Sequence, residues 1–342
     1  MKTALITGVS GQDGAYLAKF LLKKKYKIIG LDRRSSRDDQ WRFNYLEIKD
    51  QIIFEYSDLT EISSIQRIFN KYKIDEVYNL AAQSFVGSSF EVPISTCDVN
   101  ALGALRILEV IRNSKNKIKF YQASTSEMFG NAQDNPQNEK TFFNPQSPYA
   151  ISKTFAHYIT KNYRNSYGIH ACSGILFNHE SPLRGEEFVT RKITVGLAKI
   201  INKDLKCLYL GNIDSKRDWG YAEDYVEAMW LMMQRKTADD FVIATNKSYS
   251  VKDFINEAVK YYDLKIAWKG EGIKQKAVDK KNNKVIIRID PKLYRPSEVN
   301  FLKGNAAKAR NMLKWKPKVD FKKLVEIMSK ADINRFLNNR LH

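Results

Sequence analysis

The segment from Ala123 to Lys153 contains the side chains best suited to acid–base chemistry. A hydroxyl and a carboxylate, Thr125 and Glu127, precede a phenol, Tyr149, and the ammonium of Lys153. The phenol and the ammonium are four residues apart, so on a helix they share one face. A free tyrosine has a pKa of about 10, and a neighbouring cation lowers it. The spacing therefore predicts Tyr149 as a general base with Lys153 beside it, although Y-x-x-x-K also occurs by chance on amphipathic helices.

Two elements must position these side chains. A strand is expected over Ile118–Gln122, so the hydroxyl and the carboxylate follow its carboxyl end. A helix is expected over Pro148–Ser166, because proline suits the first helical position and Ser147 suits the N-cap. Ligands of doubly wound sheets bind at the carboxyl ends of the strands, so this edge is the predicted site.

A glycine-rich turn near the N-terminus points to the same edge. The expected strand Thr3–Thr7 leads into Gly8, Gly11 and Gly14, and a helical pattern follows. Strand, glycine turn and helix form the context of the dinucleotide fingerprint. Its glycines let the backbone approach a pyrophosphate at the helix N-terminus. The turn therefore predicts a nicotinamide dinucleotide.

The end of the second expected strand, Lys27–Leu31, gives conflicting signals about which dinucleotide binds. Asp32 lies 18 residues after Gly14 (32 − 14), where an acid binds the ribose hydroxyl of NAD. The following R-R-S-S run at 33–36 suits the 2′-phosphate of NADP. The balance favours NADP and leaves NAD open.

The alternation of strands and helices predicts an α/β fold: a Rossmann-type doubly wound parallel sheet with a smaller, mainly helical C-terminal substrate domain. The further strands are expected at Ile52–Tyr56, Val77–Leu80, Ala171–Leu176 and, returning to the sheet, Phe241–Ala244. We assign residues 1–176, with about 221–250, to the dinucleotide-binding domain. Residues 177–220 and 251–342 form the expected substrate domain.

The composition restricts the class of protein further. The three cysteines lack disulfide or metal spacing and the four histidines do not cluster, so no metal is expected. No signal peptide or membrane-spanning run is seen, which favours the cytoplasm. The net charge of +19 raises nucleic-acid binding as an alternative. The basic residues are spread along the chain without interleaved aromatics, so we favour a solvated surface.

The chain also resembles the extended short-chain dehydrogenases/reductases, and more closely the GDP-mannose 4,6-dehydratase family. The resemblance covers nearly the whole length. Its carriers are I-T-G-V-S-G-Q-D-G (6–14), R-R-S-S (33–36), Y-N-L-A-A-Q-S (78–84), Y-Q-A-S-T-S-E-M-F-G (121–130), S-P-Y-A-I-S-K (147–153), G-I-L-F-N-H-E-S-P-L-R-G (174–185), F-V-T-R-K-I-T (188–194), R-D-W-G (217–220) and Y-R-P-S-E-V (294–299).

The resemblance implies a catalytic role for four residues. Tyr149 takes the proton of the sugar O4 while C4 is oxidised. Lys153 holds the nicotinamide ribose and lowers the pKa of Tyr149. Glu127 removes the C5 proton, and Thr125 and Glu127 assist the loss of water from C6. Internal oxidation, dehydration and reduction then regenerate the cofactor in each turnover.

The resemblance also implies the binding residues and a homo-tetramer. The cofactor contacts are Gly8, Gly11, Gln12, Asp13, Gly14, Arg33, Asp58, Leu59, Leu80, Ala81, Ala82, Ser84, Lys153, His179 and Arg184. The GDP-sugar contacts are Ser84, Glu127, Asn178, Val189, Lys192, Gly211, Arg217, Arg295 and Glu298.

Alternatives remain at the level of the substrate and the reaction. An epimerase or 4-keto reductase is possible in this superfamily, but neither needs a carboxylate at Glu127. Some relatives act on GDP-manno-heptose, whose sugar carries an extra hydroxymethyl group at C6. Both GDP-mannose and GDP-D-glycero-manno-heptose are therefore carried as candidate substrates of a 4,6-dehydratase.

Overall fold

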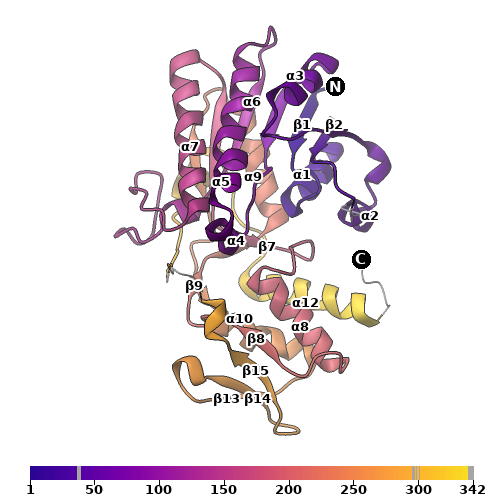
Figure 1. Ribbon diagram of the computed structural model, residues 1–342, viewed down its shortest axis with the longest axis vertical. Helices are drawn as coiled ribbons and strands as arrows, with labels where there is room; N and C mark the ends of the chain where they lie inside the picture. Colours follow the sequence, from indigo (N-terminus) through magenta and orange to yellow (C-terminus); the bar gives the residue numbers. More distant parts are fainter. Residues whose placement is uncertain (37–39, 295–296, 298, 300, 338–342) are drawn as a thin grey trace.

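A parallel seven-stranded sheet forms the centre of the larger lobe in the computed structural model, which describes residues 1–36, 40–294, 297, 299 and 301–337 (Figure 1). Its strand order is β11-β6-β5-β4-β1-β2-β3, and every neighbouring pair runs parallel. The strands are β1 (Thr3–Thr7), β2 (Lys27–Asp32), β3 (Ile52–Tyr56), β4 (Glu76–Asn79), β5 (Lys119–Thr125), β6 (Ala171–Leu176) and β11 (Asp240–Ile243). This is the predicted Rossmann-type arrangement.

Helices cover both faces of this sheet, and the side chains of β1 show the alternation. Ala4 and Ile6 join a core with residues of α1 (Gln12–Lys23) and α9 (Ala222–Gln234). Leu5 points to the other face, into a core with α3 (Ile62–Lys71), α6 (Gly103–Arg112) and α7 (Pro148–Tyr167). Strands β1, β4 and β6 are buried along nearly their whole length, as expected for a parallel sheet covered on both faces.

Most expected elements are confirmed, and β5 is the informative difference. The bounds of β1, β3 and β6 agree with the prediction, and Ser147 caps α7 by accepting a hydrogen bond from Ala150 N at 3.1 Å. Strand β5 continues to Thr125 rather than ending at Gln122. Its last residues pair with β6, Thr125 opposite Leu176, so the sheet itself holds the start of the catalytic stretch.

The smaller lobe combines helices with a four-stranded sheet. Its core lies between α8 (Val189–Ile201), α10 (Val251–Ala258) and α12 (Phe321–Leu337), below the larger lobe in Figure 1. The sheet has the order β13-β14-β15-β8, made by β8 (Leu208–Leu210), β13 (Ile266–Lys269), β14 (Lys276–Asp279) and β15 (Val285–Ile289). The lobe is therefore less purely helical than expected, because these short strands cover one side of its helices.

The other short elements pack on the larger lobe or lie between the two lobes. They are α2 (Trp41–Leu46), α4 (Val86–Glu91), α5 (Pro93–Cys97), β7 (Asn178–Glu180), β9 (Lys216–Arg217), β10 (Trp219–Tyr221), β12 (Tyr249–Ser250) and α11 (Ala307–Leu313). Strand β7 pairs with β10, and β9 pairs with β12. Within the described ranges, no helix is both long and apolar enough to span a bilayer.

One late segment packs in the larger lobe, not the smaller one. Val299, Leu302, Ala309 and Trp315 belong to the same core as α1 and α9. The two domains remain a prediction, with residues 1–176 and about 221–250 in the dinucleotide-binding domain and residues 177–220 and 251–342 in the substrate domain. The packing shows that the chain crosses once more into the first core before α12.

Candidate active site

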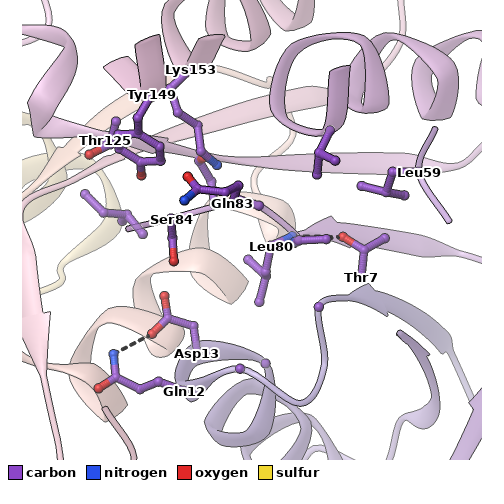
Figure 2. Close-up of a pocket in the computed structure, with 18 of the residues that line it drawn as sticks. Thr7, Gln12, Asp13, Leu59, Leu80, Gln83, Ser84, Thr125, Tyr149 and Lys153 are labelled. Atoms are coloured by element: carbon purple, nitrogen blue, oxygen red, sulfur yellow. Dashed lines mark hydrogen bonds between the residues drawn. The ribbon is translucent and has the colours of Figure 1, made fainter. Parts of the chain in front are cut away.

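A cavity of about 590 Å³ lies at the carboxyl ends of the central strands (Figure 2). The glycine turn and the start of α1 form one wall, while β5 and α7 form the other. In Figure 2, Thr125, Tyr149 and Lys153 lie on the side opposite Gln12 and Asp13. The two motifs found in the sequence therefore face one another across a single space.

The glycines of the turn are required by close backbone contacts. Gly8 has φ +66°, and a Cβ on it would lie 2.8 Å from Ala81 Cα. A Cβ on Gly14 would lie 2.5 Å from Gly8 O and 2.6 Å from Val9 Cα. The turn is thus packed against the loop after β4, and backbone rather than side chain lines this wall of the cavity.

The catalytic side chains are buried together at the ends of β5 and α7. Tyr149 and Glu127 are each 8% exposed and Lys153 is 3% exposed. Burial raises the pKa of Tyr149 to about 12, against a hydrogen bond with the Thr125 side chain that lowers it. Burial lowers the pKa of Lys153 to about 8, and its Nζ donates to Ala123 O at 2.9 Å.

Lys153 is not among the groups that act most on the pKa of Tyr149. After burial and the Thr125 hydrogen bond, the charges that act most on the phenol are those of Glu127, Arg184 and Asp13. Arg184 is the cation among them, and it favours the phenolate. The spacing of four residues places the two side chains on one face of α7, but the ammonium extends to the backbone of β5 instead.

An ion pair connects the start of α1 to β7. His179 Nε2 lies 2.7 Å from Asp13 Oδ2, and its Nδ1 donates to Phe177 O at 2.8 Å. Burial lowers the pKa of His179, but Asp13 and the Phe177 carbonyl outweigh this and raise it above the usual value. The ring also stacks on Tyr225, with centroids 4.6 Å apart. The imidazolium therefore fixes the carboxylate of Asp13 at the cavity wall.

The loop that carries Arg184 is held by two arginines which the sequence did not reveal. Arg42 of α2 donates to Leu183 O at 2.8 Å and to Ser10 O of the glycine turn at 3.0 Å. Arg191 of α8 donates to the carbonyl oxygens of Pro182 and Arg184, both at 2.8 Å. Arg42 contacts residues 32 and 141 positions away, so no local signal marks it, whereas Arg191 lies in the quoted segment 188–194 and contacts residues 7 and 9 positions before it.

Two buried acceptors in the cavity wall suit a polar ligand. Gln83 Oε1 and Asn178 Oδ1 are buried and have no hydrogen-bond partner among the described residues. Both residues line the cavity. Buried polar atoms normally have a partner, so these acceptors, together with the glycine wall, fit a dinucleotide with its amide and hydroxyl donors.

Nineteen of the predicted site residues line this one cavity. They are Gly8, Gly11, Gln12, Asp13, Gly14, Arg33, Asp58, Leu59, Leu80, Ala81, Ala82, Ser84, Thr125, Glu127, Tyr149, Lys153, Asn178, His179 and Arg184. Gln83 and Ser124, which were not predicted, also line it and lie within the quoted motifs, as does Ser126, the second hydroxyl beside Thr125. The shared lining supports a common site.

The other predicted substrate residues lie in the smaller lobe or nearby. Val189 and Lys192 are in the first turn of α8, and Gly211 follows β8. Arg217 is on β9 and is buried. None of these four lines the cavity. Arg295 and Glu298 lie outside the described residues.

Comparison with known proteins agrees with this geometry. A family model described as GDP-mannose 4,6 dehydratase matches residues 5–328. The GDP-mannose 4,6 dehydratase of Drosophila melanogaster is 49% identical over 346 residues, covering 99% of this chain and 88% of the relative.

Solved structures share the fold at low identity. The dTDP-glucose 4,6-dehydratase of Bacillus anthracis, in complex with NAD, has a TM-score of 0.80 at 19% identity, covering 100% of this chain and 98% of that one. RMD of Pseudomonas aeruginosa, complexed with NADPH, has a TM-score of 0.76 at 19% identity, covering 98% and 100%.

The sheet, the glycine turn and the second lobe define a protein with the fold of the nucleotide-sugar dehydratases and epimerases. Within that class the match over nearly the whole chain is specific. The protein belongs to the GDP-mannose 4,6-dehydratase family.

Proposed function

We propose that the protein converts GDP-mannose to GDP-4-keto-6-deoxymannose and water. The observation that carries this proposal is the carboxylate of Glu127, buried in the same cavity as Thr125 and Tyr149. An epimerase or a 4-keto reductase needs an acid–base group at C4 alone. A dehydratase also needs a base for the C5 proton, and Glu127 supplies it.

The roles of the residues follow from their chemistry. Tyr149 accepts the O4 proton as C4 becomes a ketone, which acidifies the C5 hydrogen. Glu127 then removes the C5 proton, and with Thr125 it protonates the hydroxyl that leaves C6 as water. The remaining proton is returned to C5 when C6 is reduced, so the protons balance within one turnover. A bound nicotinamide accepts a hydride and gives it back within the same cycle.

The proton acceptor at Tyr149 needs help from its neighbours. Burial opposes the phenolate, while the Thr125 hydrogen bond and the charge of Arg184 favour it. We therefore assign to Thr125 and Arg184 the lowering of the pKa that the sequence had suggested for Lys153. Lys153 is assigned to the nicotinamide ribose, because its ammonium already lies in the cavity wall.

We propose NADP as the cofactor. Arg33 lines the cavity at the end of β2, close enough to Asp58 for its charge to lower the pKa of that carboxyl after the hydrogen bonds of Thr60. The carboxylate of Asp32 accepts a hydrogen bond from Ser10 N at 3.1 Å. A guanidinium at this place suits a 2′-phosphate. Titration calorimetry should give tighter binding of NADP than of NAD, and the reverse order would exclude this choice.

Mass spectrometry tests the reaction and the sugar together. The purified protein is incubated in parallel with GDP-mannose and GDP-D-glycero-manno-heptose, and NADP is added to half of the samples. Loss of one water from GDP-mannose supports the proposal, and preferential loss from the heptose would move the assignment to that sugar. A product of unchanged mass would indicate an epimerase and overturn the dehydratase.

We also propose a homo-tetramer, on the family resemblance carried by the R-R-S-S run at 33–36. Light scattering coupled to size-exclusion chromatography measures the mass. The chain mass is 39.6 kDa, and a peak at the mass of one or two chains would contradict the tetramer.

A further inference from the structure

Strand β5 and helix α7 are joined by three contacts next to the catalytic groups. In order along the strand, the pairs are Ala123 with Lys153, Ser124 with His157, and Thr125 with Tyr149. The strand residues are consecutive, and the helix residues are spaced by four along α7, so they lie on one face. The first and third pairs contain the ammonium and the phenol of the proposed mechanism. The middle pair has no role in it.

His157 is a buried, uncharged side chain that lies behind the cavity wall. It is 5% exposed, and its ring meets Phe143 edge to face with centroids 5.2 Å apart. Burial lowers its pKa, and the charges of Arg164 and Lys161 lower it further against the opposing effect of Asp240. The imidazole is therefore neutral at physiological pH and can act as one donor and one acceptor.

The surroundings of the ring decide which nitrogen accepts. Asp240 Oδ2 lies 3.9 Å from His157 Nε2, and Arg164 holds that carboxylate with two hydrogen bonds of 2.8 Å. A carboxylate favours the proton on the nitrogen that faces it, so Nδ1 is the acceptor. The hydroxyl of Ser124 then donates to Nδ1 at 3.2 Å.

Ser124 connects this histidine to the cavity. It is 3% exposed, it lines the cavity, and it directly precedes Thr125. We propose that His157 is a positioning residue for the reaction: through Ser124 it fixes the end of β5, and thereby the Thr125 hydroxyl against the phenol of Tyr149. The inference rests on the proposed dehydratase function.

Two variants of His157 separate positioning from packing. The amide of Asn in His157→Asn can occupy the place of Nδ1, whereas that of Gln in His157→Gln can occupy the place of Nε2. Both lose the ring that packs on Phe143, so both lower the melting temperature. We expect His157→Asn to keep kcat near the wild-type value, and His157→Gln to lose about tenfold to a hundredfold, because small misplacements of reacting groups have effects of this size. KM and NADP affinity should change little in either variant.

A double-mutant cycle gives the second measurement. Ser124→Ala removes the hydroxyl that Nδ1 accepts, so it should lower kcat to the same degree as His157→Gln. The double variant should lose no more than either single variant, because both break the same contact. Fully additive losses would overturn the proposal. Equal kcat values in His157→Asn and His157→Gln, whether reduced or unchanged, would also overturn it. A greater loss of kcat in His157→Asn than in His157→Gln would do the same.

A failure of the proposed dehydratase function can be distinguished from a failure of the positioning role of His157. It would be seen in the wild-type protein as no loss of water from GDP-mannose with NADP present. The positioning role is judged only from ratios between variants and wild type, in a reaction that the wild type performs.

Discussion

Glu127 lies at 8% exposure between the end of β5 and the cavity, and its carboxylate distinguishes a dehydratase site from a site for simple oxidation and reduction. We expect Glu127→Gln to abolish release of the 4-keto-6-deoxy product, because an amide cannot take the C5 proton. NADP binding should be retained, since the glycine wall is untouched. Product analysis with calorimetry on the same sample measures both, and a normal rate of product release would remove the assigned role.

Tyr149 is the group assigned to the first oxidation. In Tyr149→Phe the ring still fills its buried position, but nothing accepts the O4 proton. We expect no absorbance of reduced nicotinamide on mixing with GDP-mannose, and a fall in kcat of at least about a hundredfold, the size typical of general base catalysis. Rapid-mixing spectroscopy makes the measurement. A burst of reduced cofactor in the variant would assign that proton to another residue.

Lys153 links burial to stability in the protein without cofactor. Burial lowers its pKa from 10.5 to about 8, so between these values the unfolded state binds the proton and the folded state does not. Stability from this group therefore rises as the pH rises through that range, by about 3 kcal/mol in total. We expect urea unfolding between pH 7.5 and 10 to show a free energy of unfolding that rises with pH in the wild type relative to Lys153→Met, because the variant lacks the titrating ammonium. Parallel slopes would contradict the shift.

The loop Ser181–Arg184 is the element that joins the two lobes at the site. Arg191, which holds its carbonyl groups, forms a buried pair with Asp332 of α12 at 2.9 Å, and Asp332 is 0% exposed. Asp332→Asn leaves a buried guanidinium without its counter-ion, which costs about 3 to 5 kcal/mol. We expect a large loss in urea unfolding together with weaker NADP binding, because Arg184 is displaced.

A matched control lies on the same helix. Glu326 pairs with Lys323 and Lys330 at the surface of α12. Exposed pairs contribute little to stability, so Glu326→Gln should leave unfolding and NADP binding nearly unchanged. Equal behaviour of the two variants would show that the pair of Asp332 does not support the loop.

How far the sequence predicts each element depends on burial. Strands β1, β3 and β6 could be predicted because they are short apolar runs between clear turn and helix signals. Strand β13 was not predicted, because it is only partly buried and gives no clean alternation. The glycine turn and the tyrosine–lysine pair are local patterns and were found. Arg42, His157 and Asp332 act through partners distant in the chain, which no spacing rule reveals.

At the scale of the whole molecule, the charge of +19 is the main argument for nucleic-acid binding. Many of the described basic residues are engaged in ion pairs with acids of both lobes, for example Arg164 with Asp240 in the larger lobe and Arg191 with Asp332 in the smaller one. We expect only weak association with mixed-sequence duplex DNA, lost by about 150 mM salt, since non-specific binding depends steeply on salt. Fluorescence anisotropy at several salt concentrations measures it, and tight binding that persists would revive the nucleic-acid hypothesis.

The packing of Val299, Leu302, Ala309 and Trp315 in the first core has a consequence for synthesis on the ribosome. The edge strand β11 is completed only at Ile243, and the apolar side chains of Leu302, Ala309 and Trp315 reach the same core later still. A nascent chain that has produced all the strands of the large sheet therefore still exposes apolar surface on α9, which these residues cover. Such partly covered intermediates are prone to aggregate. The larger lobe thus depends on the last part of the chain, and chaperone binding during translation should be strongest between the emergence of β11 and that of α11.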